Sequence, residues 1–298
     1  MPPMLLARAV STVGRGKMAW AVAFAPRLRL SIVERSGLTL DTQFVPASPL
    51  PANRNPCLYI LLRGSWRADD GVSSFVGPAA FVVSEEHLEG ADGERPLTYR
   101  TDRERFAMIE VHVDAADSPL RAGIAPAKVD LDTRAWEAAQ RLADLASHDD
   151  ESMTRAVSAL LESLAALSFL NRDVTETAAQ PPNAAFRLLW KAVRPLAERL
   201  DLLPTVQQLS AATGVSPRVV DRSVRAFLSA AGLVGDGWRT ASRHMRLKMA
   251  VIMLSADETT VGEVAQAIGY GSDDAMARAF RDAKLPPPGA VRDALRVT

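Results

Sequence analysis

Residues 260–283 read TVGEVAQAIGYGSDDAMARAFRDA, and residues 205–228 read TVQQLSAATGVSPRVVDRSVRAFL. Both stretches begin with Thr-Val, place an Ala two positions before a Gly, and resume at a Ser that precedes a helical pattern with Arg. A Gly can take the left-handed conformation that a tight helix exit needs, and a Ser caps the helix that follows. Each stretch therefore predicts a helix, a short turn and a second helix.

Two helices joined in this way form a helix-turn-helix, whose second helix can enter the major groove of DNA. Arg218, Arg222 and Arg225 recur at helical spacing on the polar side of the first copy, and Arg278 and Arg281 do so in the second. Arg is the side chain that reads guanine with two hydrogen bonds and also holds phosphate. A single hairpin of this kind is common in helical proteins, but two tandem copies favour DNA binding.

The charge distribution agrees with a DNA-binding C-terminal part. The whole chain has a net charge of zero, yet residues 181–298 carry 16 Lys and Arg against 11 Asp and Glu, a net +5. Residues 1–180 carry 19 against 24, a net −5. This asymmetry indicates an interaction face on the C-terminal domain.

Length and cysteine content set the broad class. The 298 residues are enough for two domains, and the single Cys57 allows no disulfide within the chain, which fits a reducing compartment. No apolar run approaches the ~20 residues that span a bilayer. We therefore expect a cytoplasmic protein without a membrane segment. The short apolar run after Lys17 leads into a first strand or, as the minor alternative, belongs to a signal peptide; with Met18 as the start, residues 1–17 would be a disordered tail.

Hydrophobic patterning predicts an α+β protein in four segments. Short β-branched runs separated by turns predict an antiparallel β barrel or sandwich over residues 20–120. Residues 127–170 are helical in pattern, residues 171–184 lack periodicity and indicate a linker, and residues 185–298 are helical throughout. One apolar stripe of the second segment is either core or a contact with a second subunit: Val157, Leu160, Leu161, Leu164 and Leu167.

The region from about 185 to 296 resembles the DNA-binding domain of the AraC/XylS family of bacterial transcription regulators. The second copy carries the family pattern without a gap, in IGY–S, RAFR and the Pro before the last helix, and RLKMAVIMLSAD (246–257) resembles the helix that connects the two motifs. The resemblance implies that both recognition helices enter successive major grooves on one face of the DNA.

Carried over residue by residue, the resemblance implies base contacts and phosphate contacts. The base-contact candidates are Arg218, Asp221, Arg222, Asp274, Ala275 and Arg278. The phosphate-contact candidates are Ser216, Arg225, Ser272 and Arg281. Two departures bear on affinity: Asp221 and Asp274 replace residues that are often neutral and polar in the family, and about six extra residues are inserted near 229–237.

The N-terminal part resembles a cupin-like barrel, a fold in which family members sense small molecules or dimerise. The candidate effector pocket consists of Tyr59, Arg63, Trp66, Tyr99 and His112. A catalytic cupin needs clustered His and Glu ligands for a metal. His87 has acidic neighbours, Glu85, Glu86 and Glu89, but in a sequence typical of a solvated turn, so we expect no metal, no cofactor and no catalytic residue.

The sequence thus predicts a regulator of transcription that binds double-stranded DNA and is not an enzyme, with activation the commoner habit of the family. RNA polymerase, a small-molecule effector and a second copy of the chain are further partners that the resemblance implies. The alternative is a cupin-like small-molecule or metal-binding protein, enzymatic in one version, whose helical domain has lost DNA binding.

Overall fold

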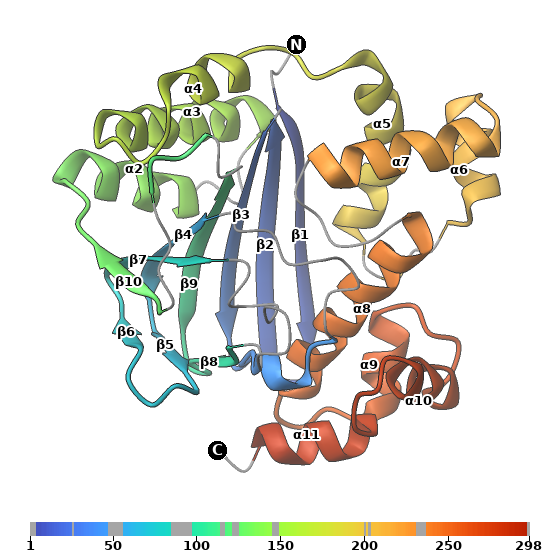
Figure 1. Cartoon of the computed structure of the whole chain (residues 1–298). Helices are drawn as coiled ribbons and strands as arrows, with labels where there is room; N and C mark the ends of the chain where they lie inside the picture. The colour runs from blue at the N-terminus through green and yellow to red at the C-terminus, as the bar shows by residue number, and fades with distance from the viewer. Residues whose placement is uncertain are drawn as a thin grey trace.

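The computed structural model describes residues 4–25, 27–46, 56–84, 97–113, 117–120, 125–144, 149–199, 201, 204–230 and 237–296. The N-terminal part combines antiparallel sheets with three helices, and the C-terminal part is entirely helical (Figure 1). This is the α+β architecture that the sequence predicts.

Ten strands form two antiparallel sheets in the described part. The larger sheet has the order β1-β2-β3-β9-β4-β7-β10 and consists of β1 (Leu5–Val13), β2 (Gly16–Ala25), β3 (Leu28–Ser36), β9 (Phe106–Val113), β4 (Pro56–Arg63), β7 (Ala79–Ser84) and β10 (Ala127–Val129). The smaller sheet consists of β6 (Ser74–Val76), β5 (Ser65–Ala68) and β8 (Tyr99–Thr101). Trp66 of β5 packs on Phe81 of β7, with ring centroids 4.9 Å apart, so the smaller sheet faces one end of the larger one.

The larger sheet has two different faces, because successive side chains of a strand point to opposite sides. Leu28, Leu30 and Ile32 of β3 belong to an apolar core under the helices α2 (Thr133–Asp144), α3 (Asp150–Ala166) and α4 (Arg172–Ala178). Arg29 and Arg35 of the same strand point to the other face, toward the C-terminal helices. Figure 1 shows α2, α3 and α4 on one side of the sheet and α5 to α11 on the other.

The N-terminal segment is a strand, which corrects two expectations. The expectation of a disordered tail is wrong for residues 5–13, because β1 pairs with β2 along its whole length, from Leu5 opposite Phe24 to Val13 opposite Gly16. The apolar run after Lys17 lies within β2. Gly14, with φ of 52°, supplies the left-handed turn residue that a two-residue hairpin needs. The sheet therefore begins at Leu5 and not at residue 20.

The segment expected as a linker holds a helix. In α4, Val174 and Ala178 are buried in the core under the sheet, so residues 172–178 pack with the N-terminal part. Four of the five residues in the predicted apolar stripe lie in the same core: Val157, Leu160, Leu161 and Leu164 are each at most 1% exposed. The fifth, Leu167, directly follows α3 and is half-buried. These four side chains are therefore core residues of one chain and offer no surface to a second subunit.

In the described residues of the C-terminal part there are seven helices. They are α5 (Ala184–Glu198), α6 (Val206–Thr213), α7 (Pro217–Ala230), α8 (Trp238–Leu254), α9 (Val261–Ala267), α10 (Asp273–Asp282) and α11 (Pro288–Arg296). Figure 1 shows α8 running between two groups, with α5, α6 and α7 at one end and α9, α10 and α11 at the other. No helix in the described residues is long and apolar enough to cross a membrane.

Both ends of the C-terminal part are anchored on the N-terminal sheet. At one end, Phe24 of β2 contacts the rings of Trp190 in α5 and Phe227 in α7, with centroids 5.3 and 5.2 Å apart. At the other end, Arg103 pairs with Asp257 at 2.7 Å and donates to the carbonyl oxygen of Leu295. The sheet is thus in contact with the scaffold of each helix-turn-helix.

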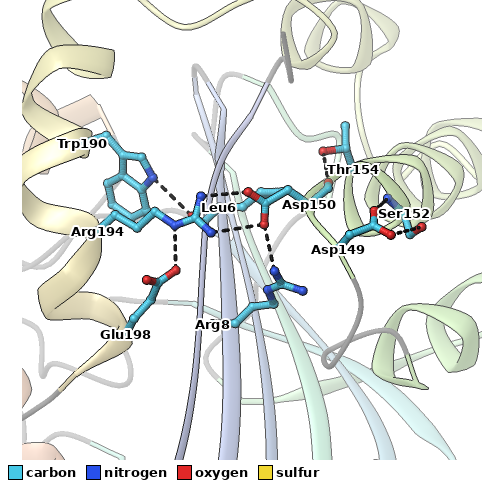
Figure 2. Close-up of polar contacts among 9 residues, drawn as sticks. All are labelled: Leu6, Arg8, Asp149, Asp150, Ser152, Thr154, Trp190, Arg194 and Glu198. Carbon is cyan, nitrogen blue, oxygen red and sulfur yellow. Dashed lines mark hydrogen bonds and ion pairs between the residues drawn. The ribbon is translucent and has the colours of Figure 1, made fainter.

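A polar network ties α5 to β1 and α3 (Figure 2). Asp150, at the start of α3, pairs with Arg194 of α5 through both carboxylate oxygens, at 2.8 and 3.2 Å, and with Arg8 of β1 at 3.0 Å. Arg194 also donates from Nε to Glu198 at 2.6 Å. Trp190 donates from its indole nitrogen to the carbonyl oxygen of Leu6 at 3.3 Å.

Candidate nucleic-acid interface and effector cavity

The two predicted motifs are both present, and their first helices begin in the same way. Thr205 caps α6 and Thr260 caps α9, each accepting a hydrogen bond from a backbone N–H three residues on. Gln208 and Glu263 reach back to the backbone of those caps, which completes a capping box in each motif. The two copies of the sequence motif therefore begin their first helices with the same capping interactions.

The turns also match. Gly214 ends α6 with φ of 70°, and Gly269 follows α9 with φ of 74°, both in the left-handed region that an L side chain rarely adopts. Ser272 then caps α10 by accepting from the backbone N–H of Ala275 at 3.2 Å. Ser216 precedes α7, and its carbonyl oxygen accepts from Val220 at 3.0 Å. Each motif thus presents a second helix, α7 or α10.

The polar faces of these second helices are open to solvent. Val220, Val224, Phe227 and Leu228 bury one side of α7, and Met276 and Phe280 bury one side of α10. The exposed candidates are Ser216, Arg218, Arg222 and Arg225 around α7, and Ser272, Asp274, Arg278 and Arg281 around α10. Asp221 and Ala275 are half-buried. The arginines therefore stand on the faces that a groove or a phosphate could reach.

Asp221 does not stand alone on its face. Its carboxylate pairs with Arg225 one turn later, at 2.8 Å between Oδ2 and Nη2. A candidate base contact and a candidate phosphate contact thus bind each other in the protein without DNA. The inserted residues near 229–237 fall mostly on 231–236, which lie outside the described residues.

A cavity of about 700 Å³ lies between the sheet and the C-terminal helices. Its apolar walls come from β2, α5, α7 and α8, with Trp20, Phe24, Trp190, Phe227 and Met245 among them. The inner faces of α7 and of the connecting helix α8 therefore form part of its wall. A molecule in this cavity would touch the buried side of α7.

Another part of the lining is polar and predominantly basic. Arg29, Arg35, Glu110 and His112 line it from β3 and β9, and Lys248 lines it from α8. Among the described lining residues, Glu110 is the one acidic side chain, whereas Arg29, Arg35 and Lys248 are basic. A buried excess of positive charge is costly unless an anion compensates for it, so the wall is suited to a negatively charged group.

Arg35 has buried N–H donors in this wall that an anion could accept from. It is 4% exposed, donates from Nη2 to Thr101 at 3.0 Å, and stacks over Phe106 at 4.5 Å. Its Nε and Nη1 are buried and have no hydrogen-bond partner. Burial lowers the pKa of Arg35 to about 10, so it is still a cation at neutral pH.

Glu110 and His112 form an ion pair in the same wall, with 3.4 Å between Oε2 and Nε2. Burial alone raises the pKa of Glu110, but His112 and the charges of Lys248 and Arg29 outweigh it and lower that pKa to about 2. Burial and Arg29 lower the pKa of His112, whereas Cys57 and Glu110 raise it, to a net value of about 10. The same Nε2 also lies 3.4 Å from Cys57 Sγ, so Cys57, His112 and Glu110 do not form a relay through two ring nitrogens.

Of the predicted pocket residues, Tyr59, Tyr99 and His112 line the cavity. Trp66 lies behind this lining, fully buried and stacked on Tyr99 with centroids 4.9 Å apart. Arg63 is not in the lining and pairs with Glu34 at 3.6 Å. The structure thus places three of the five at the cavity and two away from it.

The candidates predicted from the sequence did not include Arg29, Arg35, Glu110 or Lys248. A signal was present in β3, where the polar residues of LRLSIVER alternate with Leu28, Leu30 and Ile32. Polar residues on the face opposite a core usually meet water, and the sequence does not show that the C-terminal helices cover this face.

No group of three His, Cys, Asp or Glu side chains that could hold a metal gathers in the part of the chain that the structure describes. The acidic turn around His87, with Glu85, Glu86 and Glu89, lies outside those residues.

Comparison with known proteins gives structural neighbours only. No family model matches the chain, and no curated protein matches its sequence. ToxT from Vibrio cholerae aligns over 89% of this chain and 98% of its own, with a TM-score of 0.37 and 6% identity. ToxT with a bound unsaturated fatty acid aligns over 87% and 94%, with a TM-score of 0.36 and 8% identity. The AraC-like transcriptional activator CuxR aligns over 83% and 86%, with a TM-score of 0.29 and 13% identity.

CuxR is described as AraC-like, the family that the C-terminal sequence resembles. At TM-scores below 0.5 this likeness does not itself assign a function. The class of the protein is defined by its own residues: a β-rich N-terminal domain with an internal cavity, followed by a helical domain with two helix-turn-helix motifs.

Proposed function

We propose that the chain is a sequence-specific DNA-binding regulator of transcription that places α7 and α10 in successive major grooves. The observation that carries this proposal is the doubled motif, in which two solvent-facing helices each present arginines opposite a buried apolar side. Phosphate contacts by Arg225 and Arg281 supply affinity that falls with salt, and Arg218, Arg222 and Arg278 read bases.

The test is selection from random duplex DNA with the purified chain at two salt concentrations. We expect enrichment of two short sequence blocks about 10 base pairs apart. Arg222→Ala should lose the preference in one block and Arg278→Ala in the other, each at a cost of about 1–3 kcal/mol at the specific site. Arg292→Ala, on α11 and outside both motifs, is the matched control and should keep the preference in both blocks. Enrichment of no sequence at either salt would contradict the proposal.

We propose further that a small amphipathic anion in the cavity controls this activity. The wall around Arg35 suits a carboxylate, and the wall around Trp20, Phe24 and Trp190 suits a hydrocarbon or aromatic body. Because the second wall includes Phe227 of α7, occupancy would act directly on the first recognition helix. This location favours control by a ligand over an isolated storage or enzymatic site.

Oleate and oleyl alcohol make a matched pair of probes, since they differ in the charged group. A ligand present at 100 times its Kd adds about 2.7 kcal/mol to the free energy of unfolding. Oleate should raise the Tm more than the alcohol, and Arg35→Met should abolish the difference. An equal shift with both probes in the wild type, or an oleate shift that still exceeds the alcohol shift in Arg35→Met, would count against the anion site.

A further inference from the structure

The two helix-turn-helix motifs meet at one junction, where the turn of the second lies against the segment that leads into the first. A Cβ atom added to Gly269 would come closer than 3.0 Å to the backbone carbonyl oxygen of Asp201 and to Nη2 of Arg246. Real Cβ atoms do not approach other atoms so closely. The absence of a side chain at Gly269 therefore allows the two segments to touch.

Arg246 of α8 lies at the centre of this junction. It is 3% exposed, and its guanidinium stands 5.1 Å from the ring centroid of Tyr270, in the turn of the second motif. Burial lowers the pKa of Arg246, while the charges of Tyr270 and Asp201 oppose that shift. One buried cation thus interacts with the connecting helix, the second motif and the segment before the first motif.

The first motif provides an internal comparison. Gly214 occupies the same position in its motif and has nearly the same φ, 70° against 74° for Gly269. A Cβ atom at Gly214 would meet nothing within 4 Å. The two glycines therefore share a role in the turn, and only Gly269 has a second role in contact between the motifs.

We propose that this junction, through Arg246 and Gly269, fixes the relative position of α7 and α10 and so determines the spacing between the two DNA blocks that the chain binds. The inference rests on the proposed DNA-binding function. Bases follow one another at about 3.4 Å along a strand, so a displacement of one motif against the other changes which spacing fits best. Arg246 and Gly269 are then specificity-determining residues that need not touch DNA.

The first test is competition among duplexes that contain the two selected blocks at spacings from about 7 to about 13 base pairs, around one helical turn. We expect the wild type and Gly214→Ala to prefer one spacing. In Gly269→Ala and Arg246→Met the ratio of that spacing to its neighbours should fall at least threefold. An unchanged ratio in both variants, or an equal fall in Gly214→Ala, would overturn the role of the junction.

A second measurement is independent of DNA and separates this inference from the proposed function. Spin labels at Ala226→Cys in α7 and Asp274→Cys in α10 report the distance between the recognition helices by pulsed electron resonance, while the native Cys57 is fully buried. Each variant is first checked for wild-type circular dichroism, and Arg246→Lys, which keeps the charge, replaces Arg246→Met if the latter does not fold.

We expect one narrow distance distribution in the wild type and Gly214→Ala, and a shifted or broader one in Gly269→Ala and the Arg246 variant. Identical distributions in all four proteins would overturn the inference even if DNA is bound. A broadened distribution in a protein whose wild type enriches no DNA would support the junction and contradict the proposed function.

Discussion

Asp221 and Arg225 on α7 form an ion pair that would restrain the proposed DNA binding. Their ion pair on α7 holds a cation that would otherwise be available to a phosphate, and both side chains are partly exposed, at 39% and 64%. Such exposed pairs contribute little to stability, so their main effect is on what else the arginine can bind.

Asp221→Gln should therefore strengthen binding to all DNA sequences and make the salt dependence steeper by about one phosphate contact. The measurement is fluorescence anisotropy with selected and unrelated duplexes over a range of salt. Asp293→Asn, which removes an exposed carboxylate from α11, is the control. If Asp221→Gln instead weakens binding to the selected duplex alone, Asp221 reads a base.

His244, on the cavity side of α8, gives a prediction on pH. Burial, with a smaller effect of Lys248, lowers the pKa of His244 from its usual 6.5 to about 4. The folded protein thus keeps this ring neutral where the unfolded chain binds a proton. The stability that the neutral ring contributes is full above pH 6.5 and is lost as the pH falls toward 4.

His244→Gln should flatten the loss of stability between pH 6.5 and 4, by at most about 1.4 kcal/mol per pH unit. Urea unfolding of both proteins at several pH values in this range measures the difference. A variant whose stability falls as steeply as that of the wild type would show that His244 is protonated in the folded state.

At the scale of elements, α5 is the helix that connects the first motif to the sheet. Asp150 accepts hydrogen bonds from Arg194 of α5 and Arg8 of β1, and its side chain is 32% exposed (Figure 2). Neutralising it removes the carboxylate that Arg8 and Arg194 share, although Arg194 keeps its pair with Glu198. The aromatic contacts of Trp190 stay in place.

Asp150→Asn should lower the free energy of unfolding by about 1–2 kcal/mol at low salt, because hydrogen bonds to charged groups are worth more than neutral ones and partial exposure reduces the effect. Urea unfolding at about 0.05 and about 1 M NaCl measures the difference in free energy of unfolding between the wild type and the variant. This difference should be smaller at the higher salt, because salt screens the ion pairs. Glu151→Gln, which removes a charge from the same first turn of α3, should cost less than half as much. Equal losses in the two variants would indicate a helix-terminus effect and no bridging role for Asp150.

Elements with strong local signals could be predicted from the sequence, and elements that depend on partners could not. The two motifs were predictable because capping residues and turn glycines are local, as Thr260, Gly269 and Ser272 show. Helix α4 was missed because it has only two buried apolar residues, Val174 and Ala178, too few for a periodic pattern. Strand β1 was missed although its turn with β2 carries a clear glycine signal.

At the scale of the whole molecule, the cavity could not be predicted because its walls come from distant parts of the chain. Arg29 and His112 belong to paired strands, whereas Lys248 and Phe227 arrive from helices more than 100 residues later. Only the packing of the C-terminal helices on the polar face of the sheet turns these residues into one site. That packing also makes Phe227 of α7 part of the cavity wall.

We propose that α7 and α10 bind two successive major grooves on one side of the DNA. Methylation protection of guanine N7, which lies in the major groove, tests it directly on a duplex obtained by selection. We expect two protected patches about one helical turn apart on one face, with Arg222→Ala removing protection in one patch and Arg278→Ala in the other. A single patch, or protection that neither variant changes, would contradict it.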